Sequence, residues 1–305
     1  MRITLLGMGA WGSTLAELWQ SRGHDVATWS RRRGGDPGET LAGAELVVSA
    51  VAMAGIPALA AQLAPRWPAE VPLLSCSKGI DPEGLCTATQ LWSGPLPDVP
   101  MAALSGPNLA SELASGLPAA SVIASIDRAL AQRLQGELRT PHLRLYTNAD
   151  PLGTEIAAAL KNVMAIAAGI SDGLGLGANA KASLLCRGLA ETGLVLKALG
   201  GHPSTLYGLA GLGDLLATAN SPLSRNYRFG LLLAEGVGAA AAEERIQATV
   251  EGPRTARAAL RLADRDGWSL PICRQVVELL DGRLSAPQAV QALMDREPRP
   301  EELQW

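Results

Sequence analysis

The sequence predicts an α/β doubly wound sheet followed by an all-helical C-terminal domain. Short apolar runs of β type alternate with helical segments as far as about residue 148. Beyond that point the segments are long, rich in Ala and Leu, and apolar at helical spacing. We therefore expect two domains in the 305-residue chain, at residues 1–148 and 149–305.

The first region begins with a strand, a helix and a second strand. The apolar run RITLLG ends in glycine, the helical stretch WGSTLAELWQSRG follows, and HDVATWS forms the next strand. Four further runs have β character, namely ELVVSAV, VPLLSCS, MAALSG and ASVIAS. Strands separated by helices favour a parallel sheet with helices on both faces.

The second region contains no run with strand character. Its main segments are TEIAAALKNVMAIAAGI, ANAKASLLCRGLAETGLVLKALGG, TVEGPRTARAALRLADRDG, PICRQVVELLDG and APQAVQALMDRE. Apolar residues recur in each of them at the spacing of a helix face. We expect helices throughout this region.

Composition excludes several classes of protein. The net charge is -3 and the basic residues are dispersed, so neither nucleic acid nor an anionic membrane surface is an expected partner. The longest uncharged stretch, residues 46–61, is too short to span a membrane, and the N-terminus carries no secretory signal. The four cysteines lack the spacing of a zinc site or a disulfide framework: Cys76, Cys86, Cys186 and Cys273. We expect a cytoplasmic protein with free thiols and no metal.

A glycine-rich motif follows the first predicted strand. Gly7, Gly9 and Gly12 form the pattern G-x-G-x-x-G, with a strand before it and a helix after it. Gly7 would make the tight turn, Gly9 would let a pyrophosphate approach the backbone, and Gly12 would let helix and strand pack closely. The pyrophosphate would lie at the helix N-terminus. This context predicts a Rossmann-type dinucleotide-binding domain.

The second predicted strand ends at basic residues. NAD-specific domains carry Asp or Glu there to accept from the ribose 2′-hydroxyl, whereas this chain has Arg31 and Arg32. A guanidinium matches a 2′-phosphate bidentately, so the stretch favours NADP(H), with NAD(H) possible. The alternative interpretation is a solvated basic turn.

Polar residues gather after later strands and in one glycine-rich segment. Lys78 and Gly106 each follow a predicted strand, at the edge where ligands bind in such folds. The segment GLAGLGDLLATANSPLSRNYRFG adds Asp214, Ser224, Arg225 and Asn226. Because the last three precede a helical run, their backbone amides and the Arg225 guanidinium could bind a phosphate.

Lys161 and Asn162 interrupt an otherwise apolar helix. Lys161 is either a surface lysine whose stem covers apolar surface or a functional amine inside a cleft. Apolar surroundings would lower the pKa of such an amine toward neutrality, as proton transfer requires. The pattern alone leaves both interpretations open.

Six motifs follow one another along nearly the whole chain. They are GMGAWG, SKG, SGPNLASELA, ALKNVMAIAAGISDGLGLGANAKASL, GLAGLGDLLATANSPLSRNYRFG and VEGPRTA. In this order they resemble the NAD(P)-dependent glycerol-3-phosphate dehydrogenases. The resemblance implies an oxidoreductase that reduces dihydroxyacetone phosphate to sn-glycerol 3-phosphate for phospholipid synthesis. It also implies a homodimer.

The resemblance further implies roles for individual residues. It makes Lys161 the residue that transfers the proton, with Asp214 orienting the lysine or the substrate. The implied substrate-site residues are Lys78, Gly106, Asn108, Asp214, Ser224, Arg225 and Asn226. Besides the three glycines, the implied cofactor contacts are Trp11, Arg31, Arg32, Lys78, Ala110, Arg225 and Glu251.

Two departures from the family pattern and three alternatives accompany this interpretation. The segment GGDPGETLAGA is shorter than its usual counterpart, which affects how the adenine side of the cofactor is covered. Asn108 stands where bacterial members commonly have Ser or Thr.

One alternative function is that of an NADP-dependent reductase of small hydroxy acids or ketoacids, although SPLSRN is a phosphate site that such an enzyme does not need. A dehydrogenase using His202 and a non-catalytic NADP(H) sensor are the others.

Overall fold

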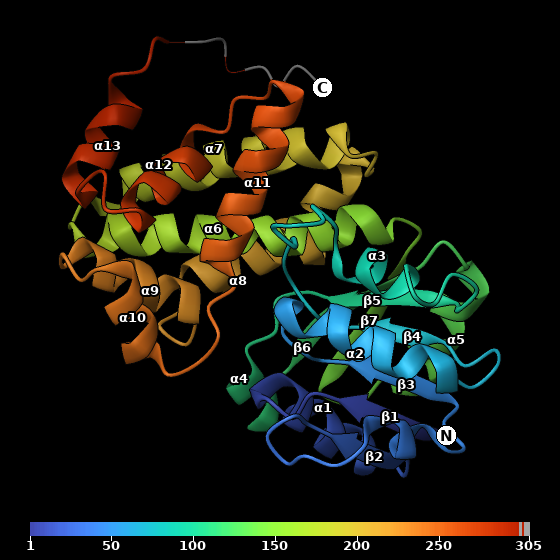
Figure 1. The fold of residues 1–305 in the computed structure, drawn as a ribbon. Coiled ribbons are helices and arrows are strands. Elements are labelled where there is room, and N and C mark those ends of the chain that lie inside the picture. Colours follow the sequence, from blue (N-terminus) through green and yellow to red (C-terminus); the bar gives the residue numbers. More distant parts are fainter. Residues whose placement is uncertain (299–300, 302–305) are drawn as a thin grey trace.

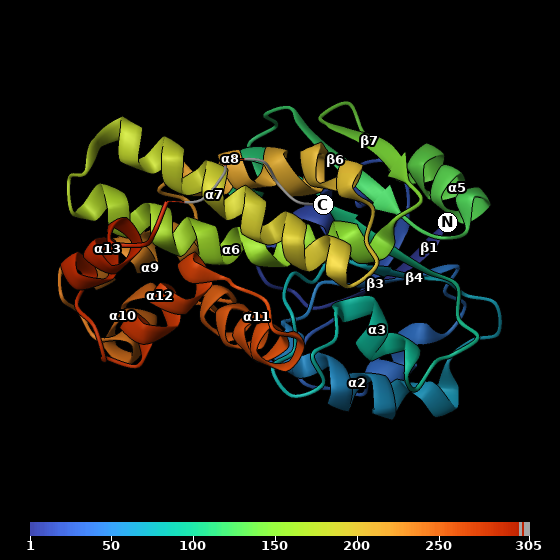
Figure 2. The same cartoon turned by 90° about the horizontal axis from the view of Figure 1, so that it is seen from above.

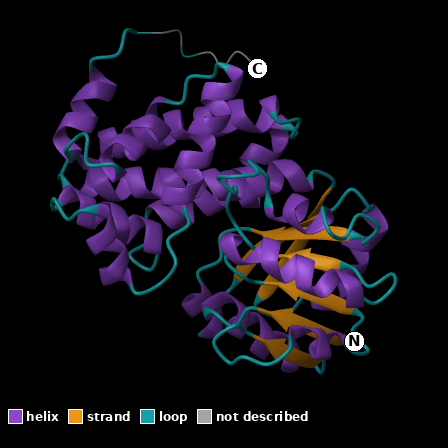
Figure 3. Ribbon diagram, viewed as in Figure 1, coloured by secondary structure: helices purple, strands orange, loops and turns teal. Residues whose placement is uncertain are grey.

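A computed structural model describes residues 1–298 and 301 of the chain. It has a sheet region and a helical region side by side, with the sheet confined to the first half of the chain (Figures 1 and 3). The strands are β1 (Arg2–Leu6), β2 (Asp25–Trp29), β3 (Leu46–Ser49), β4 (Leu73–Ser75), β5 (Met101–Ser105), β6 (Ala119–Ala124) and β7 (Leu143–Asn148). The helices of this region are α1 (Ala10–Gln20), α2 (Ile56–Leu63), α3 (Ala88–Ser93), α4 (Ala110–Ala114) and α5 (Arg128–Leu138).

The seven strands form one sheet in the order β2-β1-β3-β4-β5-β6-β7. The first five strands of the chain are parallel, as expected, but β6 runs antiparallel to β5, and β7 is parallel to β6. The expectation of a wholly parallel sheet is therefore wrong at one pairing. The strand β7 was also not predicted, because LRLYTN alternates buried and exposed residues at the edge of the sheet and has no continuous apolar run.

Helices cover both faces of the sheet, which confirms the doubly wound α/β prediction. Alternate residues of β1 point to opposite faces: Ile3 and Leu5 pack with α1, α4 and α5, whereas Leu6 packs with α2 and α3. The chain leaves β1 toward β2 on one side and returns to β3 on the other. Ligands bind at such a switch point, outside the carboxyl ends of the strands.

The region after β7 is helical throughout its described residues, as predicted. Its α-helices are α6 (Pro151–Gly173), α7 (Gly177–Ala198), α8 (Asp214–Ala219), α9 (Arg225–Ala234), α10 (Ala239–Ile246), α11 (Gly252–Asp266), α12 (Pro271–Leu280) and α13 (Ala286–Met294). The predicted end of this region at residue 305 lies outside the described residues.

The helix α6 forms the centre of the helical region. Figure 2 shows it running lengthwise, with α7 on one side and α10 to α13 on the other. Residues 153–171 are all buried, and most of the apolar ones form one core with α7, α9, α11 and α12. By length and hydropathy α6 could cross a membrane, but the apolar stretch that meets this criterion is wholly buried in the protein. Its apolar character is explained by packing on all sides.

Candidate active site

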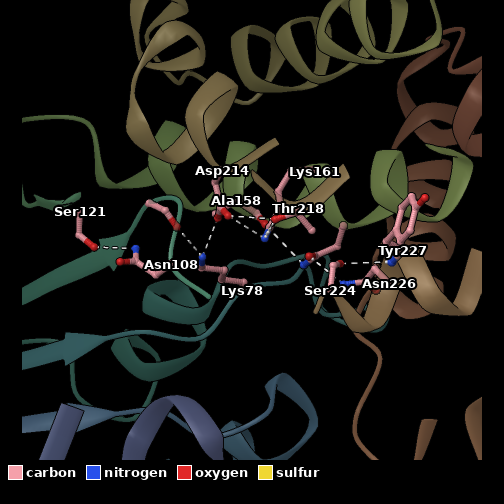
Figure 4. Close-up of polar contacts among 12 residues, drawn as sticks. Lys78, Asn108, Ser121, Ala158, Lys161, Asp214, Thr218, Ser224, Asn226 and Tyr227 are labelled. Carbon is pink, nitrogen blue, oxygen red and sulfur yellow. Dashed lines mark hydrogen bonds and ion pairs between the residues drawn. The ribbon is translucent and has the colours of Figure 1, made fainter. Parts of the chain in front are cut away.

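Two lysines and one aspartate meet at the junction of the two regions. The Asp214 carboxylate accepts from Lys161 Nζ at 2.9 Å on one oxygen and from Lys78 Nζ at 2.6 Å on the other. Lys161 also donates to the Thr218 hydroxyl at 2.6 Å, and Lys78 to the carbonyl of Gly106 at 3.2 Å. Figure 4 shows Lys78 reaching from the α/β region toward Asp214 and Lys161 of the helical region. The arrangement brings together residues from three separate motifs.

The Lys161 side chain lies inside the protein. The residue is 8% exposed and sits on α6, so the surface-lysine interpretation does not describe it. Its partner Asp214 is 2% exposed and opens α8 directly after a π-helical turn at Leu209–Gly213. Such turns are rare and occur at functional sites. A side chain at Gly211 would clash with the Leu206 carbonyl, which explains the glycine-rich sequence here.

Burial and neighbouring charges set the protonation of this cluster. Burial lowers the pKa of Lys161 to about 8; the negative charge of Asp214 opposes the shift, and the positive charges of Lys78 and Arg225 add to it. Burial alone would raise the pKa of Asp214, but the two ammonium groups outweigh it and hold that pKa below its usual value. Asp214 is therefore a carboxylate at neutral pH. Lys161 can gain or lose a proton at a pH close to neutral.

The glycine-rich turn after β1 has the shape that a dinucleotide requires. Gly7 has φ +103, and a Cβ there would lie 2.7 Å from the Ala50 carbonyl. A Cβ on Gly12 would lie 1.9 Å from the Gly7 oxygen, so only glycine lets α1 approach β1 this closely. At Gly9, the N-cap of α1, a Cβ would meet nothing within 4 Å, and no side chain caps the helix. The residues present fit a pyrophosphate at this helix N-terminus.

The arginines after β2 differ in their contacts. Arg33 donates to the Thr28 hydroxyl at 3.4 Å, whereas no hydrogen bond or ion pair from the described residues engages the exposed side chains of Arg31 and Arg32. In the shortened segment, residues 34–44, Asp36 accepts two hydrogen bonds from the Arg66 guanidinium in a bidentate ion pair. Arg31 and Arg32 are thus the guanidinium groups available to a ligand beside the glycine-rich turn.

The N-terminus of α9 presents Arg225. Ser224 is the N-cap of this helix, and its hydroxyl accepts from the Tyr227 amide at 3.2 Å. Arg225 is the first residue of the helix and is exposed, while Ser224 is buried. Because helix dipole and guanidinium favour negative charge at the same place, this terminus suits an anion.

Asn226 is held by protein partners on both ends of its amide. Its Nδ2 donates to Asn162 Oδ1 at 2.9 Å, and its Oδ1 accepts from the Gly252 amide at 3.0 Å. The side chain therefore joins α9, α6 and α11, directly beside the residue that follows Lys161. Each amide end retains one further donor or acceptor for a substrate.

The turn after β5 supplies three more predicted residues. Gly106 has φ +151, and a Cβ there would lie 2.9 Å from the Ser121 Cα, so glycine is required. Asn108 Nδ2 donates to the Ser121 hydroxyl at 2.7 Å, while its buried Oδ1 has no partner among the described residues. Ala110 starts α4, and its carbonyl accepts from Thr14 of α1 at 3.3 Å. This places Ala110 against the helix that starts at the glycine-rich turn.

Glu251 and Trp11 complete the predicted set. The Glu251 carboxylate precedes α11 and accepts from the Met53 amide of the α/β region at 3.2 Å, so it joins the two regions. Burial raises the pKa of Glu251, and this hydrogen bond and the charges of Arg254 and Arg225 oppose the rise. Trp11 is half-buried in the first turn of α1. It packs against the sheet core on that face.

Three residues of this junction were not among the predicted site residues. Thr218 lies four positions after Asp214 on α8 and shares its contact with Lys161, a helical spacing that the sequence already displays. Asn162 adjoins Lys161, and its role is visible only once Asn226 is seen to contact it. The third, Glu155, lies in the apolar run of α6 and binds a helix of the other region.

His202 lies away from this cluster. The His202 amide donates to Asp150, the N-cap of α6, and Lys161 lies 11 residues along that helix, a distance of about 16 Å. In residues 1–298 and 301, no group of three or more His, Cys, Asp or Glu side chains is placed to hold a metal ion.

Family models match most of the chain. The model described as NAD-dependent glycerol-3-phosphate dehydrogenase C-terminus matches residues 150–291. The corresponding N-terminus model matches residues 2–36 and 33–131. The two matched regions thus correspond to the helical region and to most of the sheet region.

Relatives of known name match the chain end to end. It is 56% identical over 299 residues to a glycerol-3-phosphate dehydrogenase (NAD(P)+) of Synechococcus sp. (strain RCC307), covering 98% of this chain and 99% of the relative. A protein of the same name from Synechocystis sp. is 46% identical over 297 residues, covering 97% and 94%. The structure is similar to glycerol-3-phosphate dehydrogenase of Coxiella burnetii, with a TM-score of 0.92, 34% identity, and coverage of 97% and 99%. A ketopantoate reductase of Ralstonia eutropha, with a TM-score of 0.61 and 16% identity over 95% and 100% of the chains, shares the fold alone.

Proposed function

This chain belongs to the NAD-dependent glycerol-3-phosphate dehydrogenase family, and from that premise we propose how its residues carry out the reaction. The enzyme uses NAD(P)H to reduce dihydroxyacetone phosphate to glycerol 3-phosphate, and the reaction is reversible. The predicted alternatives, a reductase of small hydroxy acids or ketoacids and a non-catalytic sensor, are set aside. The observation that carries the proposal is the Lys161–Asp214–Lys78 network at the junction of the α/β and helical regions.

Lys161 is proposed to transfer the proton. A bound nicotinamide cofactor would supply the hydride for C2 of the substrate in reduction and would accept it in oxidation. In reduction the Lys161 ammonium donates a proton to the oxygen on C2, and in oxidation the neutral amine takes it back. A pKa of about 8 makes both forms available near neutral pH. Asp214 and Thr218 hold Nζ in place through hydrogen bonds of 2.9 and 2.6 Å.

The substrate phosphate is proposed to bind at the N-terminus of α9. Arg225 supplies a planar guanidinium, and the backbone amides of the first turn supply neutral donors. Ser224, Asn226 and Asn108 are proposed as further substrate contacts around it. Binding energy from the phosphate positions C2 against Lys161, because interactions at the non-reacting end can be used for orientation at the reacting end.

The α/β region is proposed to bind the cofactor, with NADP(H) preferred. Gly7, Gly9 and Gly12 would hold the pyrophosphate, and Arg31 and Arg32 the 2′-phosphate. Trp11, Lys78, Ala110, Arg225 and Glu251 are proposed to contact the rest of the cofactor. We further propose that residues 1–148 and 149–305 are separate domains and that the site lies between them.

The cellular setting is also a proposal. Glycerol 3-phosphate is the backbone of glycerophospholipids, which supports a role in their synthesis. All four cysteines are free thiols, which supports a reducing cytoplasm. A homodimer is proposed from the family resemblance, and sedimentation of the purified protein would reveal its mass.

The test of this function is oxidation of NADPH with dihydroxyacetone phosphate as the substrate. The account predicts rapid turnover with this substrate and very slow turnover with unphosphorylated dihydroxyacetone at the same concentration, because the latter cannot use the α9 site. Comparable rates with the two substrates would contradict the proposed phosphate site.

A further inference from the structure

The segment from Lys78 to Thr89, which we call the docking segment, belongs to the α/β region but contacts the helical region along its length. It starts just after β4 and ends in the first turns of α3. At its beginning, Lys78 donates to Asp214. At its end, Thr87 and Thr89 bind Glu155 of α6. One segment therefore crosses the boundary at both ends.

Glu155 is a buried carboxylate with three donors from the other region. The residue is 3% exposed. It accepts from the Thr87 hydroxyl at 2.6 Å, from the Thr89 amide at 2.9 Å and from the Thr89 hydroxyl. Burial raises the pKa of this carboxyl, and the three hydrogen bonds oppose the rise. Loss of the carboxylate would leave the buried Thr87 hydroxyl and the half-buried amide and hydroxyl of Thr89 without their acceptor at the boundary, which is costly.

The middle of the docking segment adds apolar and polar contacts. Ile80 is 2% exposed and packs in a small core with Ala159 of α6 and Leu262 of α11. The carbonyl of Pro82 accepts from the guanidinium of Arg261. These contacts leave the segment little freedom once Glu155 fixes its far end.

We propose that Glu155 is a positioning residue, which anchors the docking segment so that Lys78 meets Asp214 beside Lys161. Glu155 touches neither lysine and acts through the segment. The inference rests on the site proposed above, in which Lys78 and Asp214 contact substrate or hold Lys161. Misplacement of a reacting group by about 1 Å can cost roughly 10²-fold in rate, so a loosened anchor affects turnover without altering the dinucleotide-binding turn.

Glu191 provides a matched control. It is also a buried glutamate, 7% exposed, and its carboxylate accepts from two backbone amides at the start of α12, Ile272 at 2.6 Å and Cys273 at 3.2 Å. Both partners belong to the helical region that holds Glu191 itself. Removing Glu191 therefore disturbs a helix cap as removing Glu155 does, but does not release the docking segment.

The experiment compares Glu155→Ala, Glu155→Gln and Glu191→Ala in the full enzyme. Glu155→Ala should lower kcat by roughly ten- to 10²-fold while the Kd for NADPH changes less than about twofold. Glu155→Gln should recover most of the rate, because its amide can accept from the Thr89 amide and donate to the two hydroxyls. Glu191→Ala should lower Tm but leave kcat within about twofold. Thr89→Val, which removes one donor, should show a smaller loss of kcat and serves if Glu155→Ala does not fold.

A double-mutant cycle identifies the route of the effect. If Glu155 acts by placing Lys78, Glu155→Ala should slow the parent enzyme but hardly slow the Lys78→Met variant further. The proposal is overturned if Glu155→Ala lowers Tm but not kcat, or if Glu191→Ala lowers kcat as much as Glu155→Ala does. It is also overturned if kcat of Glu155→Gln is no higher than that of Glu155→Ala. Additive losses of kcat from the substitutions at positions 155 and 78 would overturn it as well. Lys161→Met tests the proposed site separately, since that variant keeps Glu155 and its contacts with Thr87 and Thr89.

Discussion

The two sides of the proposed active site differ in the kind of group that each one uses. The proposed cofactor side uses backbone geometry and exposed cations: Gly7 and Gly12 are required by close contacts, and Arg31 is exposed. The opposite side uses buried charges, with Lys161 at 8% and Asp214 at 2% exposure. A binding site for a large ligand can be formed by local chain geometry, whereas a group that exchanges a proton needs an environment that shifts its pKa.

The largest loss of activity should come from a substitution on the buried side, at Lys161. Lys161→Met retains the length of the side chain and removes its charge, so turnover should fall by about 10²–10⁴-fold while NADPH affinity stays nearly unchanged. Rapid-quench measurements at saturating substrate and NADPH would report the loss. A lysine that only held phosphate would instead raise KM and leave the saturated rate largely intact.

The glycine-rich turn of the proposed cofactor side should not tolerate an added side chain at Gly12. In Gly12→Ala the new Cβ would lie 1.9 Å from the Gly7 oxygen, so α1 must move away from β1. Overpacking of this kind costs about 1–3 kcal/mol of stability, and thermal unfolding would measure it. Gly9→Ala serves as the control, because its Cβ meets nothing within 4 Å. It should unfold near the parent temperature but bind NADPH more weakly. Equal Tm values for the two variants would contradict the close-packing role of Gly12.

Arg225 should matter through its shape as well as its charge. Arg225→Lys keeps the positive charge at the N-terminus of α9 but loses the planar fork, so KM for dihydroxyacetone phosphate should rise by about tenfold, the value of one charge-assisted hydrogen bond. Steady-state kinetics at saturating NADPH would show the change. An unaltered KM would mean that the phosphate binds elsewhere.

An effect of about the same size as at Arg225, but on cofactor binding, should come from the exposed arginines. Replacing Arg31 and Arg32 together by alanine should weaken NADPH binding by roughly tenfold, after a discount for their exposure, and leave NADH binding nearly unchanged. Fluorescence titration with each cofactor would compare the two Kd values. Equal losses for NADPH and NADH would remove the two arginines from 2′-phosphate recognition.

The same contrast explains what the sequence could and could not predict. The dinucleotide turn was predictable because its residues are contiguous and each glycine has a local geometric reason. The contacts of Lys161 were not, because its partner Asp214 is 53 residues away and Lys78 is 136 residues from Asp214. Without the family resemblance, the pattern around Lys161 allows a surface residue as readily as a buried one. The strand β7 was missed because its alternating edge pattern is weak, and Glu155 because a single acid in an apolar helix gives no sign of its partner.

The central claim is that burial tunes Lys161 to exchange a proton near neutral pH, and the pH dependence of the single-turnover rate tests it most directly. Since the neutral amine is the base, oxidation of glycerol 3-phosphate should accelerate as pH rises through about 8. Since the ammonium is the acid, reduction of dihydroxyacetone phosphate should slow over the same range. The two opposed profiles should be absent from Lys161→Met. Rates in both directions that stay level between about pH 7 and 9, or profiles that persist unchanged in Lys161→Met, would contradict the account.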